Sequence, residues 1–140
     1  MRTPLLVLAM LAGSSTAVAA DGFSGRWTID LRSPEQVESG LDCGFADFDL
    51  VQAGERLTGT HSFGTPGCGR VNDSGPVSGV VVGPNKAVLI VTSDRTGAIA
   101  YGVAELTPDR DLDWRTVGYV QDTDGDSPLI LGQGRLHPPE

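Results

Sequence analysis

Polar and apolar residues alternate with a period of two along most of this chain. Successive side chains of a β-strand point to opposite faces of a sheet, so the alternation predicts strands with one buried and one solvated face. Residues 23–31 give the first strand, with Trp27 and Ile29 on one face and Arg26 on the other. Further strands are predicted at residues 44–52, 56–63, 77–82, 87–93, 98–106, 112–121 and 129–136, which makes the chain all-β.

Short segments rich in Gly, Pro, Asn and Asp separate these strands and favour hairpins over crossover connections. The longer connection after the first strand is different. Residues 33–36 read Ser-Pro-Glu-Gln, which is a capping box with proline at the first helical position, and Gly40 follows as a stop signal. One short helical turn is therefore predicted after the first strand.

Eight strands joined by hairpins form an up-and-down meander. Closing such a meander into a barrel removes the exposed edges that would otherwise pair with other chains. We therefore predict an eight-stranded antiparallel up-and-down barrel that forms a single domain over residues 21–140, with a loop over residues 64–75.

The first twenty residues have the pattern of an export signal. Arg2 supplies a positive charge, residues 5–11 are apolar, and residues 17–20 are small. This predicts a signal peptide over residues 1–20 that is cleaved after Ala19 or Ala20. The apolar run is shorter than the roughly 20 residues that cross a bilayer, so no membrane insertion is expected after processing. We expect a periplasmic or secreted protein.

Charge narrows the range of partners. The chain has 10 Lys and Arg against 18 Asp and Glu, a net charge of −8. Nucleic-acid binding draws much of its affinity from neutralised phosphates, so an acidic chain without a basic stripe is not expected to bind nucleic acid.

Cys43 and Cys68 are the only two cysteines. An even number in an exported chain predicts a disulfide between them. A zinc or redox site would need closely spaced cysteines or clustered histidines, and the sequence has neither pattern. Neither a metal nor a cofactor is expected.

Four residues are candidates for contact with a ligand. His61 shares an alternating face with Leu57, which predicts that it points inward. It is either a ligand contact or base inside the barrel, or a core histidine whose hydrogen bonds the backbone satisfies. Trp27, Tyr101 and Trp114 combine an apolar face with a polar tip and are suited to line a cavity. No nucleophile elbow accompanies His61, so no catalytic residue is assigned.

An acidic segment over residues 122–127 places Asp122, Asp124 and Asp126 at alternate positions, as calcium loops do. The full EF-hand spacing fails, because Ser127 stands where glycine is required and Gln133 where the bidentate glutamate belongs. An acidic hairpin tip is the simpler interpretation.

The start of the first strand resembles two groups of proteins. Gly25-Arg26-Trp27 resembles the G-x-W opening of lipocalins and avidin-like barrels, the calycin superfamily, in which the tryptophan plugs one end of an eight-stranded meander. Together with the signal peptide, Cys43 and Cys68, the same strand also resembles the small periplasmic inhibitors of secreted metalloproteases. In that family, the residues before the first strand reach into the protease cleft.

These observations lead to two functional hypotheses. The first is an exported non-catalytic protein that holds a small apolar or amphipathic molecule in its barrel. The alternative is an inhibitor of an exported protein that acts through surface loops, especially residues 61–73.

Overall fold

The structure is a computed structural model that describes residues 22–140. The predicted signal peptide over residues 1–20 and its cleavage site lie outside the described residues.

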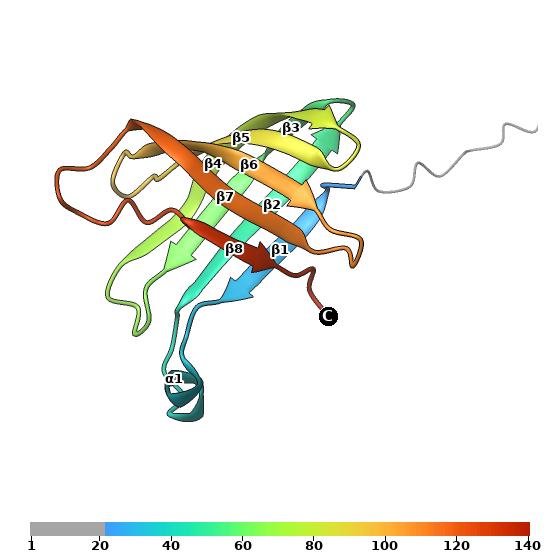
Figure 1. The fold of residues 1–140 in the computed structure, drawn as a ribbon. Coiled ribbons are helices and arrows are strands. Elements are labelled where there is room, and N and C mark those ends of the chain that lie inside the picture. Colours follow the sequence, from blue (N-terminus) through green and yellow to red (C-terminus); the bar gives the residue numbers. More distant parts are fainter. Residues whose placement is uncertain (1–21) are drawn as a thin grey trace, which may run out of the picture.

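Eight strands follow one another in sequence order within one antiparallel sheet that curls into a nearly closed barrel (Figure 1). One helical turn, α1, lies after the first strand. The all-β meander and the helical turn that the sequence predicts are thus confirmed. The elements are β1 Gly25–Asp30, α1 Pro34–Glu38, β2 Phe45–Ala53, β3 Arg56–Gly64, β4 Val71–Gly83, β5 Lys86–Thr92, β6 Ile99–Leu106, β7 Leu112–Gln121 and β8 Gln133–Leu136.

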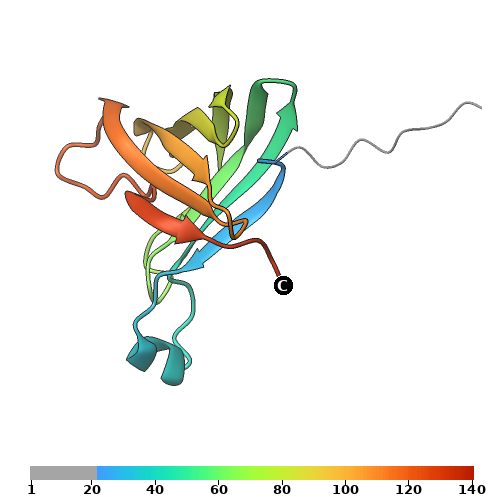
Figure 2. The same ribbon diagram turned by 45° about the vertical axis from the view of Figure 1, so that its right-hand side comes forward.

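The barrel closes between its first and last strands, which Figures 1 and 2 show next to each other. Just beyond β8, His137 pairs with Thr28 of β1, and each backbone N–H donates to the carbonyl oxygen of the other residue at 2.8 Å. This seam is a single residue pair, whereas even the short strand β8 pairs with β7 at four positions.

Side chains on the inner faces of the strands form the core. In β5, for example, Ala87, Leu89 and Val91 are fully buried, while the residues between them face solvent. Glycine is required where bulky groups from neighbouring strands approach. A Cβ atom at Gly102 of β6 would overlap the indole ring of Trp114 in β7.

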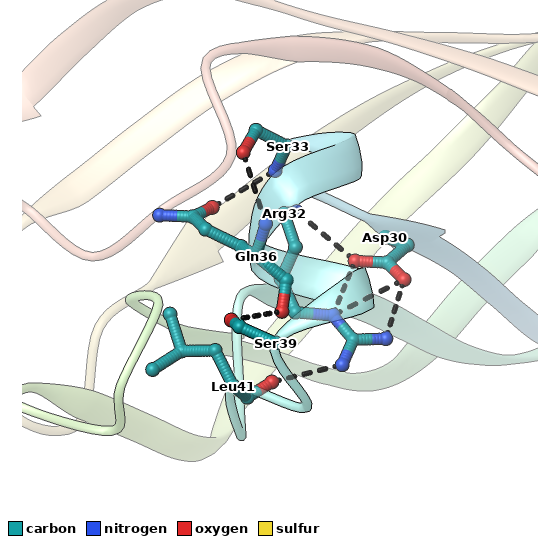
Figure 3. A network of polar contacts seen from close by, with 6 residues as sticks. All are labelled: Asp30, Arg32, Ser33, Gln36, Ser39 and Leu41. Atoms are coloured by element: carbon teal, nitrogen blue, oxygen red, sulfur yellow. Dashed lines mark hydrogen bonds and ion pairs between the residues drawn. The ribbon is translucent and has the colours of Figure 1, made fainter.

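The segment around α1 projects from one end of the barrel (Figure 1) and is fixed by polar contacts (Figure 3). The capping box forms, because the Ser33 hydroxyl accepts from the Gln36 backbone N–H and the Gln36 side chain accepts from the Ser33 N–H. Arg32 binds the Asp30 carboxylate through Nε and Nη2 and donates from Nη1 to the Leu41 carbonyl at 2.9 Å.

The predicted disulfide is present. It joins Cys43, at the end of the α1 segment, to Cys68 in the turn between β3 and β4. Two neighbouring projections at one end of the barrel are therefore covalently linked.

The predicted loop over residues 64–75 is wrong for half of its length, because β3 ends at Gly64 and β4 begins at Val71. Asn72 pairs with Phe63 of β3 and is fully buried. A bulge between His61 and Phe63 shifts the register here. The polar residues after Val71 are typical of a turn. The sequence therefore does not reveal this strand, whose buried position is occupied by the Asn72 amide.

The predicted last strand over residues 129–136 is too long, since β8 begins at Gln133. Leu129, Ile130 and Leu131 are all buried in an irregular segment. Three consecutive buried apolar residues do not fit a strand with one solvated face. The predicted strand over residues 77–82 is also too short, since β4 runs from Val71 to Gly83. The remaining six strands begin and end within two residues of their predicted bounds.

Removal of the disulfide should destabilise the fold. Cys43 and Cys68 are 25 residues apart in sequence, and closing a loop of this length is worth about 3 kcal/mol in the unfolded-chain model. The double variant Cys43→Ala/Cys68→Ala should therefore lose about 3 kcal/mol in urea unfolding. Dithiothreitol should weaken the parent protein to the same extent and leave the variant unchanged. Equal stability with and without the bridge would contradict this account.

Candidate functional site

His61 lies inside the barrel, as the sequence predicts, and none of its side chain is exposed. Its Nδ1 lies 2.8 Å from the Asp47 carbonyl oxygen, and its Nε2 lies 3.2 Å from the Leu131 backbone N. A carbonyl only accepts and an N–H only donates, so the ring carries its proton on Nδ1. Both nitrogens are engaged by backbone groups. Of the two interpretations, the geometry is that of a core histidine.

Burial disfavours the charged imidazolium and lowers the pKa of His61 from 6.5 to about 4, although the hydrogen bond to the Asp47 carbonyl opposes this shift. The ring is therefore neutral at physiological pH and keeps Nε2 free of a proton. Only in this state can Nε2 accept the hydrogen bond from the Leu131 backbone N–H.

Three rings fill the interior at the level of His61. Phe48 stacks on the His61 ring with centroids 4.5 Å apart, and its other neighbour is Trp114 at 5.1 Å. Phe48 and His61 come from β2 and β3, whereas Trp114 comes from β7. These side chains thus bridge the barrel from wall to wall, and the interior at this level is packed.

The segment over residues 129–131 closes one end of the barrel, and we call it the plug. The Leu131 carbonyl accepts from Trp114 Nε1 at 2.7 Å and from the Thr116 hydroxyl at 3.0 Å, while its N–H donates to His61. The plug therefore hydrogen-bonds to opposite walls of the barrel through one residue.

The opposite end, which we call the mouth, contains a pocket of about 640 Å³. It is formed by the start of β1, the turns between β4 and β5 and between β6 and β7, and the chain after β8. It is lined by Gly22, Ser24, Gly25, Arg26, Trp27, Asn85, Leu106, Thr107, Asp109, Arg110, Pro138 and Pro139.

Trp27 is the large aromatic side chain of this pocket. It is 95% buried, and its Nε1 donates to the Phe23 carbonyl at 3.0 Å. Leu106 and the two prolines supply further apolar surface. This part of the pocket is thus apolar.

Two guanidinium groups border the pocket. Arg26 donates from Nη2 to the Asp47 carboxylate at 3.0 Å. Arg110 makes no ion pair among the residues that the structure describes. Its backbone has a φ of 66°, a left-handed conformation that costs a residue other than glycine about 1 kcal/mol. An uncommitted guanidinium therefore lies beside an apolar wall.

The four predicted ligand-contact residues lie in three different places. Trp27 lines the mouth, and His61 and Trp114 belong to the packed interior. Tyr101 lies on the outer face of β6, where 39% of it is exposed and its ring covers Gly118. The structure brings His61 and Trp114 together through Phe48 and leaves Tyr101 apart from them.

Sequence reasoning missed the other residues of the mouth, including Leu106, Arg110 and Pro138. A topological signal was available. In a meander, the start of the first strand, every second turn and the end of the eighth strand all lie at one end of the barrel. The residues next to Trp27 could have been found by counting turns.

The acidic segment over residues 122–127 lies at the plug end and takes part in an ion pair. Arg70 Nη2 donates to Asp126 Oδ2 at 2.9 Å. Within residues 22–140, no group of three or more His, Cys, Asp or Glu side chains is placed to hold a metal ion.

Comparison with known proteins found no matching family model, no similar curated protein and no similar solved structure. No helix within residues 22–140 is long and apolar enough to cross a membrane.

The buried imidazole should make stability depend on pH. Between pH 6.5 and about 4 the unfolded chain binds a proton at His61 that the folded chain does not bind, so stability falls as the pH is lowered. The expected loss across this window is about 3 kcal/mol, measurable by urea unfolding at each pH. His61→Leu should be less stable at pH 7 and lack this dependence.

Nuclear magnetic resonance of the ring nitrogens gives an independent readout. His61 should remain the neutral Nδ1–H tautomer until the pH approaches 4. A ring that titrates near 6.5 in the folded protein would contradict the assignment.

Proposed function

We propose that this chain is an exported, non-catalytic binding protein that holds a small amphipathic molecule in the pocket at its barrel mouth. The pocket of about 640 Å³ beside Trp27 carries this proposal. Its volume falls in the range of small-molecule sites, and the mouths of β-barrels are among the places where such sites occur.

The packing of the barrel favours the mouth over the interior as the place where a ligand binds. His61, Phe48 and Trp114 occupy the middle of the barrel, and the plug closes the far end. A molecule bound at the mouth displaces none of these groups. The ligand therefore meets Trp27 from outside the packed core.

The lining favours a compact molecule with one apolar and one acidic part. Trp27, Leu106 and Pro138 offer apolar contacts, and Arg110 offers a guanidinium to a carboxylate, sulfonate or phosphate group. Asp109 lies in the same turn and disfavours ligands with several negative charges. A single acidic group is the best match.

The state of His61 supports a non-catalytic role. A general base needs a nitrogen that can reach a substrate proton. Both nitrogens of His61 already bind backbone groups, and its side chain is fully buried.

Binding of anilinonaphthalene sulfonate, a compact aromatic anion, tests the pocket by fluorescence titration. The protein should bind the probe, and Arg110→Glu should weaken binding about tenfold or more, because one charge-assisted contact becomes a repulsion. Arg95→Glu makes the same change of charge at the plug end and should leave binding unchanged.

A second control separates the pocket from apolar surface elsewhere. Ile90→Lys alters the outer face of β5 and should not affect the probe. No binding by the parent protein, or equal losses in Arg110→Glu and Ile90→Lys, would overturn the proposal.

The α1 segment favours inhibition of an exported protease as a second candidate function. No residue of α1 is buried, yet the segment is held by a capping box, by Arg32 and by the disulfide. These restraints do not bury α1 in the core, but they fix the shape that a partner would meet. Rigid projections of this kind reduce the entropy lost on binding. Of the predicted inhibitory segment over residues 61–73, His61 is buried and the last residues belong to β4.

A panel of exported metalloproteases tests this alternative. Inhibition should be lost by about tenfold or more in Val37→Arg, which changes the half-exposed apolar side chain of α1. Arg110→Glu, at the other end of the barrel, should inhibit as well as the parent protein. Failure of the protein to inhibit any member of the panel at micromolar concentration would count against the alternative.

A further inference from the structure

The outer face of strands β4 to β7 carries a continuous group of exposed apolar side chains, which we call the outer apolar face. Its exposed fractions are large, from 37% to 56%. The residues are Val80 and Val82 of β4, Val88 and Ile90 of β5, Tyr101 of β6 and Val117 of β7. Extended apolar patches on soluble proteins commonly mark interaction sites.

The strand register makes this face continuous across the sheet. Val80 pairs with Val88, and Val88 in turn pairs with Val103. Two residues further along β5, Ile90 pairs with Tyr101. Directly paired side chains on one face of an antiparallel sheet lie about 5 Å apart, so these residues touch.

The charges around the face differ from those of the whole chain. The pairs Arg56 with Val80 and Val103 with Arg115 place an arginine on either side, and Lys86 forms an ion pair with Glu105 at 3.8 Å. Glu105 in turn pairs with Asp113 of β7, so three cations and two anions border the face, whereas the chain has a net charge of −8. Two copies that meet here therefore do not bring an excess of negative charge together.

We propose that the outer apolar face binds a second copy of this chain in a two-fold symmetric dimer. We infer that the partner is a second copy because the outer residues of β5 and β6 complement each other. At three successive levels these strands pair Lys86 with Glu105, Val88 with Val103 and Ile90 with Tyr101. A two-fold axis that is parallel to these strands and lies over the gap between them sets β5 of one copy against β6 of the other.

In this arrangement, unlike charges meet at one end of the interface. Lys86 of each copy faces Glu105 of the other copy, and the apolar pairs face each other behind them. The ion pair within one copy at 3.8 Å becomes part of a cluster of four alternating charges. No like charges on these two strands are brought together.

The size of the face predicts a weak dimer. Four strands about 4.8 Å apart and about five residues long, at about 3.3 Å per residue, give roughly 300 Å² in projection. Interfaces of standard size bury roughly 800 Å² on each partner. Association should therefore be reversible and visible only at micromolar to millimolar concentration.

Sedimentation equilibrium of the purified protein up to about 1 mM tests the dimer. The parent protein should show a monomer–dimer equilibrium, and Val88→Lys should weaken it about tenfold or more. Val51→Lys is the matched control, because it makes the same change at an exposed position of β2. Sedimentation with vesicles of phosphatidylglycerol and phosphatidylcholine distinguishes a face that binds lipid from one that binds a second copy.

A monomer at every concentration, or equal losses in Val88→Lys and Val51→Lys, would overturn the proposal. Vesicle binding that depends on Val88 in a protein that stays monomeric would also overturn it.

Mixing two charge variants tests the orientation. Lys86→Glu and Glu105→Lys each place like charges opposite each other in their own dimers. In the mixed dimer, both inter-copy pairs are restored. The mixture should therefore associate more strongly than either variant alone. If association depended on net charge alone, the less acidic variant Glu105→Lys by itself would associate more strongly than the mixture. That outcome would refute the two-fold arrangement.

Discussion

The pair of hydrogen bonds made by His61 connects parts of the fold that are far apart in sequence. One nitrogen donates to the Asp47 carbonyl of β2, and the other accepts from Leu131 in the plug. The Leu131 carbonyl binds Trp114 of β7, which packs against Phe48. The neutral imidazole is essential to this chain of contacts, because a charged ring would have no acceptor for the plug.

Sequence periodicity identified the strands because their inner positions are mostly apolar and their outer positions mostly polar. It failed at Asn72, whose buried amide donates to the His61 carbonyl and accepts from the backbone N–H of Asp94. It also failed at the plug, where Leu131 leaves the strand geometry to bind His61. In both places a specific hydrogen bond, rather than alternation, decides the conformation.

The candidate site was only partly predictable for a related reason. Trp27 carries a local motif and can be identified from one strand, whereas the pocket around it is assembled from turns and from the chain after β8. The interior position of His61 followed from alternation. Its partners did not, because Leu131 is 70 residues away in sequence. Tyr101 occupies an outward position of β6, and its sequence position alone gave no indication that it covers Gly118.

The seam between Thr28 and His137 links the mouth to the integrity of the barrel. Within the described residues, two backbone hydrogen bonds close it, so it is the natural point at which the wall would begin to separate. Pro138 and Pro139 follow His137 directly and line the pocket, as do Arg26 and Trp27 of β1. A molecule seated between them would touch both sides of the seam. A ligand bound at the mouth as proposed would therefore stabilise the closed wall, because it would hold together two segments that the pair of Thr28 and His137 joins.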